Sequence, residues 1–538
     1  MERILLNRRQ EAIEDSVKPF QFGGITHVSI ADNSFIMNNV IAEFKREKKN
    51  LYIIFGDLEK CFDKLYLKDC IIELVDAGVP IEEAMFIYDM NRHIEAEVDT
   101  PHGKTKMFKI EEAVRQGTIF GTTLCGVSTN RINKMGNPDP LILHNKILIQ
   151  CPIYVDDIAG MGGKRQIENT GIKMNGLEKT KKFEFNNKED KTEVMAMKFN
   201  KQTEVEEAII EVRKGKVKNT DLYKYVGDHY DRSGTNEIKI VKKMQKSKYM
   251  AHSVRRMGSY NNVGDADMRT RLMLLESVVK LTLLSNVETW CMISTKEESS
   301  ITTKHHEILC TVLGLKRSTP YYGIIGETGI WPYIHVITYK KLMFLHHLVH
   351  SEDRRVSKRI VLVQESQQME DTWYSELKDK AKEMQLEIKT KEVEKYEKST
   401  WKKMVKEKIK ENIERELQQQ YETKSKLRFL KDKPFQEEEY LNVGNAAQCQ
   451  NIMEIRLNMV DLKMNFKGMY EDTVCTGCFE KEETTEHFIQ CKKMQELTGH
   501  NIKTNNIKED IKSTEWLMEM SELMKTLTEV RKHRLQYR

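Results

Sequence analysis

The chain has 538 residues, of which 39% are hydrophobic and 31% are charged, so its length allows about two to four domains with hydrophobic cores. Its 87 basic residues exceed its 82 acidic residues so slightly that net charge by itself does not call for a nucleic-acid partner. The chain shows no apolar leader, no apolar stretch of about 18 residues and no disulfide framework. We therefore expect an intracellular protein of the cytoplasm or nucleus that is not secreted and binds no membrane.

The first part of the chain alternates between helical and strand patterns. Apolar residues at helical spacing predict helices around Ile4 to Ile13 and over residues 32–48, 67–77 and 81–91, with a turn at 20–24. Residues 94–98 and 105–110 flank a turn at 100–103 and predict a β-hairpin. A further helix is expected over residues 122–134. Helices interleaved with hairpins predict an α+β fold.

Two apolar segments of the sequence end in aspartates. The run LYIIFG at 51–56 precedes Asp57, and the run IQCPIYVDDI at 149–158 predicts a buried hairpin with Asp156 and Asp157 at its bend. An exposed acidic turn would explain the second run alone. Buried carboxylates, however, need a positive partner, and hard divalent cations bind carboxylate oxygens. If the strands are neighbours, the carboxylates meet at one sheet edge and can hold two Mg²⁺ ions for nucleotidyl transfer.

Three runs of sequence carry a family resemblance: DLEKCFD at 57–63, VRQGT at 114–118 and YVDD at 154–157. In this order and spacing they resemble successive palm motifs of reverse transcriptases, and their wording is similar to the non-LTR (LINE-type) retrotransposon branch. The resemblance implies a right-hand polymerase palm over residues 51–235 with partial fingers over 1–50. It also implies an RNA-directed DNA polymerase whose partners are an RNA template, a DNA primer and deoxynucleoside triphosphates.

The resemblance implies a role for several palm residues. Asp57, Asp156 and Asp157 would hold the two Mg²⁺ ions, and Phe62 would exclude a ribonucleotide 2′-hydroxyl. The other assignments are Gln116 and Gly117 beside the nascent base pair, Tyr154 at the primer end, Lys191 as the acid that protonates pyrophosphate, and Tyr225 and Gly227 in a hairpin that grips the primer. Taken alone, Gly117 is an ordinary turn glycine, Phe62 a core residue and Lys191 a surface lysine.

The chain also departs from the family pattern near its start. Relatives usually carry basic residues after the paired glycines, whereas this chain has ITHV at residues 25–28, which would weaken contacts to template phosphates. The sequence begins inside the fingers region and shows no endonuclease domain before the polymerase. We therefore expect a copy that is truncated at the N-terminus.

The second half of the palm leads into a basic helix. A helix is expected over residues 172–182, a strand over 192–198 and a short hairpin around 222–228. Residues 240–257 then show helical spacing with no acid and these basic residues: Lys242, Lys243, Lys246, Lys248, Arg255 and Arg256. A solvated face usually mixes charge signs. This one predicts a surface that follows template–primer phosphates, within a helical thumb and connection over residues 236–360.

The remaining sequence is mostly helical. Alternating Lys and Glu over residues 361–440 predict a charged helical spacer, and a coiled coil is not sustained. The spacing C-x2-C-x8-H-x3-C then places Cys475, Cys478, His487 and Cys491 around one tetrahedral Zn²⁺ within a module over 441–500, unless the thiols are unrelated. Four protein ligands would make this site structural. A similar motif occurs near the C-terminus in this retrotransposon branch, and a last helix is expected over 501–538.

Two other functions remain open from the sequence. A relic or domesticated protein of the same fold would bind nucleic acid with little or no catalysis. The intact aspartates oppose this alternative, whereas the shortened fingers favour it. An RNA-templated RNA polymerase would also use paired aspartates, but Phe62 opposes it because such an enzyme must admit a 2′-hydroxyl.

Overall fold

The computed structural model describes residues 2–17, 19–92, 94–110, 113–114, 117–135, 138–180, 184–204, 206–257, 266–498 and 510–536. The described part of the chain folds as two compact units. Unit 1 consists of Met1–Lys239, Asn286–Ile293 and Lys340–Trp401, and unit 2 of Ile240–Ser285, Ser294–Tyr339 and Lys402–Arg538. Every helix among the described residues is too short or too polar to span a lipid bilayer.

Unit 1 is built around a sheet whose strands, within the described residues, run in the order β13-β10-β1-β9-β8. These strands are β1 (Leu51–Gly56), β8 (Ile153–Tyr154), β9 (Asp157–Gly162), β10 (Glu193–Met197) and β13 (Lys218–Asn219). β1 lies between β9 and β10, is antiparallel to both, and is buried over its whole length. An unbroken apolar run suits this central strand because both of its faces are covered.

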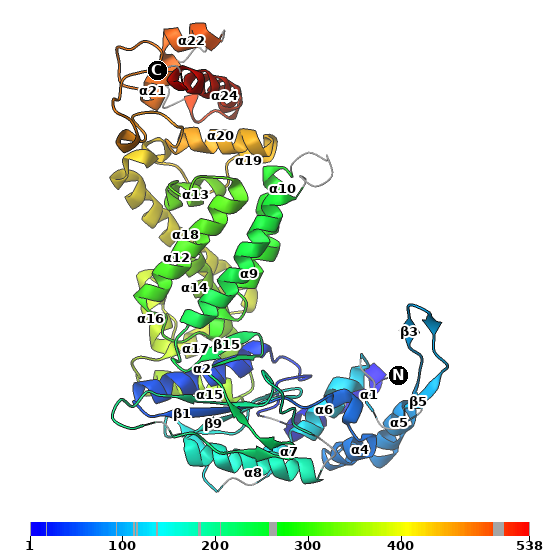
Figure 1. Ribbon diagram of the computed structural model, residues 1–538. Coiled ribbons are helices and arrows are strands. Elements are labelled where there is room, and N and C mark those ends of the chain that lie inside the picture. Colours follow the sequence, from blue (N-terminus) through cyan, green and yellow to red (C-terminus); the bar gives the residue numbers. More distant parts are fainter. Residues whose placement is uncertain are drawn as a thin grey trace. The chain divides into compact units, whose positions relative to one another are not determined.

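Helices cover both faces of this sheet (Figure 1). α8 (Lys164–Thr180) lies on one face, and α2 (Ile30–Arg46) and α15 (Val356–Ser366) lie on the other. α8 packs closely at Gly160, where an added Cβ would lie 2.7 Å from Thr170 Cγ2 of this helix. The sequence predicted α8 only from residue 172, because its first two turns are mostly polar and bury a single large apolar side chain, Ile167.

A second group of elements in unit 1 is helical, with a strand pair beside it. Its members are α1 (Glu2–Val17), α3 (Cys61–Lys64), α4 (Leu67–Asp76), α5 (Ile81–Asn91), α6 (Ile119–Thr129) and α7 (Arg131–Lys134). α6 packs against both α1 and α4, and α4 packs against α5. The predicted hairpin is confirmed, since β2 (Ile94–Ala96) pairs with β5 (Phe108–Ile110) and β3 (Asp99–Thr100) with β4 (Gly103–Lys104).

Short hairpins complete this part of unit 1. They are β6 (Leu141–Leu143) with β7 (Ile147–Ile149), β11 (Glu211–Val212) with β12 (Gly215–Lys216), and β14 (Leu222–Tyr225) with β15 (Asp228–Asp231). The apolar run before Asp156 is therefore divided between two hairpins. Ile149 ends β7, and β8 begins only after Pro152, which has no N–H for a strand ladder.

The later segments of unit 1 correct the expectation of a solvated spacer from residue 361. η2 (Val287–Thr289), α16 (Trp373–Glu383) and α17 (Thr390–Val393) pack in this unit. Trp373 is fully buried and meets Phe35 of α2 edge to face, with ring centroids 5.0 Å apart. Trp401 is also fully buried, and its Nε1 donates to Leu342 O at 3.0 Å. The many charged residues between these tryptophans favour a solvated segment in the sequence, although both tryptophans pack in the core.

Unit 2 has only helices as the regular elements of its described residues, with one isolated β-bridge that joins Val474 to Glu482. Its elements are α9 (Glu237–Arg256), α10 (Met268–Leu274), the π-helical η1 (Leu275–Val279), α11 (Lys280–Leu283), α12 (Thr295–Leu313), α13 (Tyr321–Thr328), α14 (Tyr333–Val349), α18 (Lys398–Thr423), η3 (Ser425–Leu430), α19 (Tyr440–Val443), α20 (Ala446–Arg456), η4 (Lys467–Met469), α21 (Thr485–Gln490), α22 (Lys492–Thr498) and α24 (Thr514–Gln536). The starts of α9 and α18, and α14 from Lys340 onward, belong to unit 1. A buried ion pair joins Arg456 Nε to Glu327 Oε2 at 2.8 Å, and Tyr440 donates to the same carboxylate.

α18 shows why the charged stretch is not a solvated spacer. Every fourth residue of this helix is apolar and buried: Trp401, Val405, Ile409, Ile413, Leu417 and Tyr421. Residues four apart lie on one helical face, so these side chains form one continuous apolar stripe. The Lys and Glu residues occupy the remaining faces, where pairs such as Lys408–Glu411 lie at the surface.

Candidate active site and metal centre

The unit 1 sheet brings three aspartates to one edge. Gly56, the last residue of β1, pairs with Ile158 of β9, and Asp57 follows directly. Asp157 is the first residue of β9 and pairs with Tyr154, while Asp156 lies in the loop between β8 and β9. Asp57 and Asp157 therefore leave neighbouring strands at the same end of the sheet, the arrangement that the two apolar runs predicted if the strands were neighbours.

Lys191 lies beside Asp57 at this edge. Its Nζ donates to Asp57 Oδ1 at 3.1 Å. The backbone of Asp57 is held as well, because its N–H donates to Thr192 Oγ1 at 3.2 Å and its carbonyl accepts from Asn186 N at 2.8 Å. The segment that enters β10 is thus fixed to Asp57, which places the ammonium among the carboxylates.

The electrostatics of this edge fit a hard cation. Burial, together with the neighbouring Asp156 and Asp57 charges, raises the pKa of Asp157 to about 6 against the opposing effect of Lys191. Burial also raises the pKa of Asp156. Carboxylates whose charges are costly in this way are stabilised by a positive ion, and their oxygens match the ligand preference of Mg²⁺. Asp57, Asp156 and Asp157 are the residues that would hold it.

Other residues predicted for the nucleotide site lie on different elements. Phe62 is half-buried in α3 and packs against the core beneath it, and its carbonyl accepts from Val114 N at 2.8 Å. Tyr154 is half-exposed at the end of β8. Gly117 is exposed with φ +81°, a conformation that favours glycine, and an added Cβ would meet nothing within 4 Å. Gln116 lies outside the described residues.

The β14–β15 hairpin lies against the sheet. Of its two residues predicted to contact the primer, only one is exposed. Gly227 is exposed at the bend with φ +90°. Tyr225 is buried, and its hydroxyl accepts from Asn33 Nδ2 at 3.2 Å and donates to Pro152 O at 3.2 Å. The direct primer contact predicted for Tyr225 does not fit this core position. Tyr223 instead stacks on Phe55 of β1, with ring centroids 4.1 Å apart.

The basic residues of α9 divide into exposed and buried sets. Lys246, Lys248 and Arg256 are exposed, and Lys242 and Arg255 are half-exposed. Lys243 is buried, and its Nζ donates to Ser285 Oγ at 3.0 Å, so it is not available to a phosphate at the surface. This correction follows from helical geometry, because Lys243 shares the inward face of α9 with Met244 and Ser247.

Unit 2 contains the predicted cysteine–histidine cluster. The ligand atoms of Cys475, Cys478, His487 and Cys491 all lie within 4.8 Å of one another, which makes this group, among the described residues, the one drawn together tightly enough to hold a metal ion. Cys475 Sγ is 3.8 Å from Cys491 Sγ, and Cys478 Sγ is 3.3 Å from His487 Nε2. The carboxylate edge of unit 1 is less tightly gathered. Three thiols and an imidazole match the donor set of a structural zinc site.

The local structure of this cluster explains its geometry. Cys475 N donates to Lys481 O at 2.7 Å and Phe479 N donates to Cys475 O at 3.0 Å, which closes the turn that carries Cys475 and Cys478. Thr484 caps the start of α21, since its hydroxyl accepts from His487 N at 3.0 Å, and the helix ends directly before Cys491. One helix therefore presents His487 and Cys491 to the turn.

Sequence reasoning missed two polar residues near the paired aspartates. Gln21 and Thr129 are both fully buried, and both contact the backbone of Val155 in the YVDD turn. A glutamine inside the run FQFGG and a threonine inside an apolar helix are polar residues in apolar surroundings. Buried polar groups are hydrogen-bonded, so this pattern is the signal that could have identified them.

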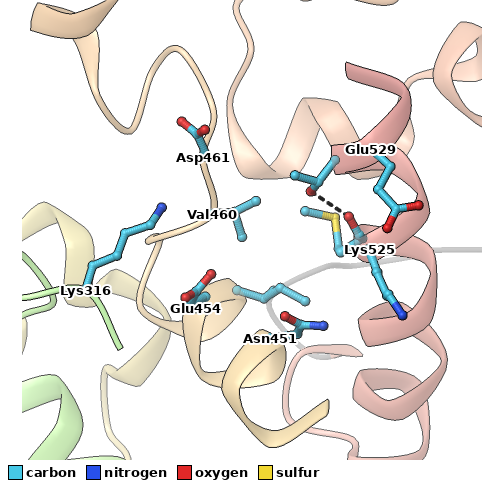
Figure 2. Close-up of a pocket in the computed structure, with 10 residues that line it drawn as sticks. Lys316, Asn451, Glu454, Val460, Asp461, Lys525 and Glu529 are labelled. Atoms are coloured by element: carbon cyan, nitrogen blue, oxygen red, sulfur yellow. Dashed lines mark hydrogen bonds between the residues drawn. The ribbon is translucent and has the colours of Figure 1, made fainter. Parts of the chain in front are cut away.

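A separate cavity of about 340 Å³ lies in unit 2 (Figure 2). Its lining mixes charged side chains, including Lys316, Glu454 and Asp461, with apolar ones such as Val460. Burial raises the pKa of Glu454. None of the predicted catalytic or metal-binding residues lines this cavity.

Comparison with known proteins relates the first part of the chain to one protein family. No curated protein matches the chain. One similar solved structure is described as the telomerase from Candida albicans in complex with a TWJ fragment of telomeric RNA; it shares 12% identity at a TM-score of 0.27 and is matched over 67% of this chain. The match spans about half, 55%, of that chain. Residues 1–252 match the family described as reverse transcriptase (RNA-dependent DNA polymerase), so the chain carries a reverse transcriptase domain over these residues.

Proposed function

We propose that this protein is an RNA-directed DNA polymerase that extends a DNA primer with deoxynucleotides on an RNA template. The observation that carries this proposal is the meeting of Asp57, Asp156 and Asp157 at one sheet edge, with Lys191 Nζ 3.1 Å from Asp57 Oδ1. The edge lies within the reverse transcriptase domain at residues 1–252. Two Mg²⁺ ions bound there would supply activation of the primer hydroxyl and stabilisation of the leaving pyrophosphate.

The protein's own residues would orient the reactants and move one proton. Asp57, Asp156 and Asp157 would hold the positive charge of the metal ions at the end of the sheet, where the primer terminus and the triphosphate meet. Lys191 would exchange its contact with Asp57 for one with the triphosphate and donate a proton to the leaving pyrophosphate. Tyr154, half-exposed beside the turn, would support the primer end.

The substrate choice would rest on Phe62 and its surroundings. The ring is half-buried in α3, a few residues beyond Asp57, and packs against the core beneath it. A fixed aromatic ring there would clash with a ribonucleotide 2′-hydroxyl and so favour deoxynucleotides. Exposed Gly117, whose φ of +81° suits glycine, would allow the nascent base pair to approach the backbone.

The remaining elements would serve the template and primer. We assign residues 1–50 to partial fingers, residues 51–235 to the palm, and residues 236–360, which begin with α9, to the thumb and connection. Exposed Lys246, Lys248 and Arg256 of α9, with Gly227 at the β14–β15 bend, would contact the nucleic-acid backbone. The motifs at 57–63 and 154–157 favour an origin in a non-LTR retrotransposon. A Zn²⁺ ion held by the Cys475 cluster would stabilise unit 2.

Primer extension on a poly(rA)·oligo(dT) duplex with Mg²⁺ and dTTP tests the proposal. We expect the wild-type protein to extend the primer and Asp156→Asn to lose at least about a thousandfold in rate, since a carboxylate ligand would be lost. Asp76→Asn, an exposed aspartate at the end of α4 and outside the edge, is the matched control and should extend normally. UTP in place of dTTP should be a poor substrate for the wild type and a better one for Phe62→Ala.

The same assay separates the alternatives. Extension with UTP as fast as with dTTP would contradict the assignment of Phe62 and favour an RNA polymerase. Tight duplex binding without extension by any variant would refute the enzyme and leave a nucleic-acid-binding protein of the same fold.

A further inference from the structure

The turn that carries the paired aspartates contains a backbone conformation that its sequence does not favour. Val155 and Asp156 form the loop between β8 and β9, and Val155 has φ +63°. β-Branched residues rarely occupy this left-handed region, because Cβ approaches the following carbonyl. Asp156 follows directly, so the conformation of Val155 sets the direction in which the carboxylates leave the turn. Something outside the turn must hold Val155 in place.

The side chain of Gln21 contacts both backbone groups of Val155. Its Oε1 accepts from Val155 N at 3.0 Å, and its Nε2 donates to Val155 O at 3.3 Å. Oε1 also accepts from Gly23 N at 3.0 Å, and Nε2 lies 3.2 Å from Thr129 Oγ1. Gln21 is 0% exposed. A fully buried amide whose oxygen and nitrogen both have partners has one stable orientation.

The surroundings of Gln21 reinforce this contact. Thr129 Oγ1 of α6 donates to Val155 O at 2.7 Å, so this carbonyl accepts from two side chains. The backbone beside Gln21 pairs with β8, since Phe22 N donates to Ile153 O and Ile153 N donates to Phe20 O, both at 2.8 Å. An added Cβ on Gly23 would lie 2.3 Å from Val155 Cγ2, so only glycine lets this segment lie against the turn.

We propose that Gln21 is a positioning residue for Asp156 and Asp157, which fixes Val155 in its left-handed conformation and thereby aims the two carboxylates at the metal-binding edge. The effect of Gln21 on catalysis rests on the proposed function. The quantity that Gln21 is expected to change directly is the affinity of the carboxylate edge for a metal ion. Without the amide, Val155 N–H loses a buried partner and Val155 can relax toward φ below zero. The turn would then present the carboxylates differently.

Terbium luminescence measures this affinity without any reaction. Tb³⁺ is a hard ion that takes carboxylate oxygens, and Tyr154 beside the aspartates can sensitise its emission. An emission that Asp156→Asn abolishes reports the edge. We expect Gln21→Leu to weaken Tb³⁺ binding about tenfold or more, the usual scale for removing a group that orients metal ligands.

The matched control is Gln364→Leu. Gln364 is also buried in unit 1, and its Nε2 donates to Asn39 Oδ1 at 2.7 Å while its Oε1 accepts from Tyr374 N at 3.2 Å, away from the YVDD turn. This variant should lose stability as Gln21→Leu does but keep its Tb³⁺ affinity. Equal loss of affinity in both variants would show a general structural effect and overturn the proposal.

Rescue by glycine distinguishes positioning from folding. Glycine adopts positive φ readily, so Val155→Gly added to Gln21→Leu should restore a large part of the Tb³⁺ affinity, and added to Gln364→Leu should change nothing. If Gln21→Leu does not fold, Thr129→Val and Thr129→Ser replace it. The serine variant keeps the hydroxyl and should bind as the wild type does, whereas the valine variant should bind several-fold more weakly; equal affinity in the two would refute the proposal.

The outcomes separate this inference from the proposed function. Dependence of Tb³⁺ binding on Gln21 without primer extension by the wild type would support the positioning role and refute the polymerase. Normal extension with a Tb³⁺ affinity that Gln21→Leu leaves unchanged would refute the positioning role alone. A wild-type protein without an Asp156-dependent Tb³⁺ signal would overturn both the positioning role and the metal-binding edge.

Discussion

The carboxylate edge of unit 1 and the cysteine–histidine cluster of unit 2 are two candidate metal sites of different kinds. In the cluster, three thiols and an imidazole lie within 4.8 Å of one another, so four protein atoms can enclose one ion. At the edge, three carboxylates are less tightly gathered, and Asp57 is paired with Lys191 instead. A closed set of four ligands is typical of structural metal sites, whereas catalytic sites keep positions for the substrate. Closeness of the ligands therefore indicates a candidate structural site, while strand register indicates a candidate catalytic one.

The backbone beside each site contains a residue with positive φ. In the cluster, Phe479 directly after Cys478 has φ +60°, and ordinary hydrogen bonds close this turn and the helix at His487. The edge depends on Val155 with φ +63°, a conformation that costs on the order of 1–3 kcal/mol and persists only where neighbours enforce it. Such strain gathers at functional sites. Its place next to Asp156 agrees with a catalytic edge.

Removal of one cluster ligand should have the largest effect on metal content. We expect the wild type to retain about one Zn²⁺ per chain after dialysis against a weak chelator, and Cys478→Ser to retain almost none, because structural zinc binds with about 10–16 kcal/mol. Elemental analysis measures this directly. Cys310→Ser, a buried cysteine outside the cluster, should keep its zinc, and so should Asp57→Asn. Zinc retained by Cys478→Ser would contradict the four-ligand site.

Removal of Lys191 tests the other site with a smaller effect. Lys191→Met should lower the single-nucleotide extension rate about a hundredfold, because the ammonium beside Asp57 would no longer protonate the pyrophosphate. Rapid-quench measurements with saturating dTTP check the rate. Lys188→Met, an exposed lysine in the same loop, is the control and should extend normally. Equal rates in both variants would remove Lys191 from the chemistry.

The lysines of α9 should show the smallest effects and can be compared on one helix. Exposed Lys246→Ala should weaken duplex binding a few-fold and reduce the slope of log affinity against log salt by about 0.9, the value for one lost phosphate contact. Buried Lys243→Met should lower the melting temperature, since Ser285 Oγ loses a hydrogen-bond donor, and leave the salt slope unchanged. Fluorescence anisotropy at several salt concentrations measures the slopes. Identical slopes in Lys246→Ala and the wild type would show that this face does not contact phosphates.

The sequence predicted periodic elements well because their signals are local. Helices α4 and α5 lie within a residue of the expected bounds, and the strands of the β2–β5 hairpin lie within three. The pairing of β1 with β9 could be proposed from the sequence, but only the folded chain establishes it, since register depends on contacts between distant segments. The prediction of a solvated spacer was wrong for α18 because only one residue in four belongs to its buried apolar stripe. The charged residues between them dominate the composition.

Parts of the candidate site were beyond the sequence for a related reason. The positions of Asp57, Asp156 and Asp157 follow from strand ends and could be predicted. The burial of Tyr225 and Lys243 depends on which face of a hairpin or helix turns inward, and residue type does not settle that choice. Gln21 is more than a hundred residues from the turn that it contacts, so its role emerged only from the folded chain.

Counting bound Mn²⁺ by electron paramagnetic resonance is the sharpest test of a catalytic metal site at the carboxylate edge. The sample is the zinc-loaded protein with a poly(rA) duplex whose oligo(dT) primer ends in a dideoxynucleotide, together with dTTP, so that no reaction occurs. We expect about two Mn²⁺ ions per complex for the wild type and a loss of at least one in Asp57→Asn, with zinc unchanged in both. Equal Mn²⁺ counts in the two proteins would contradict a catalytic metal site built on these carboxylates.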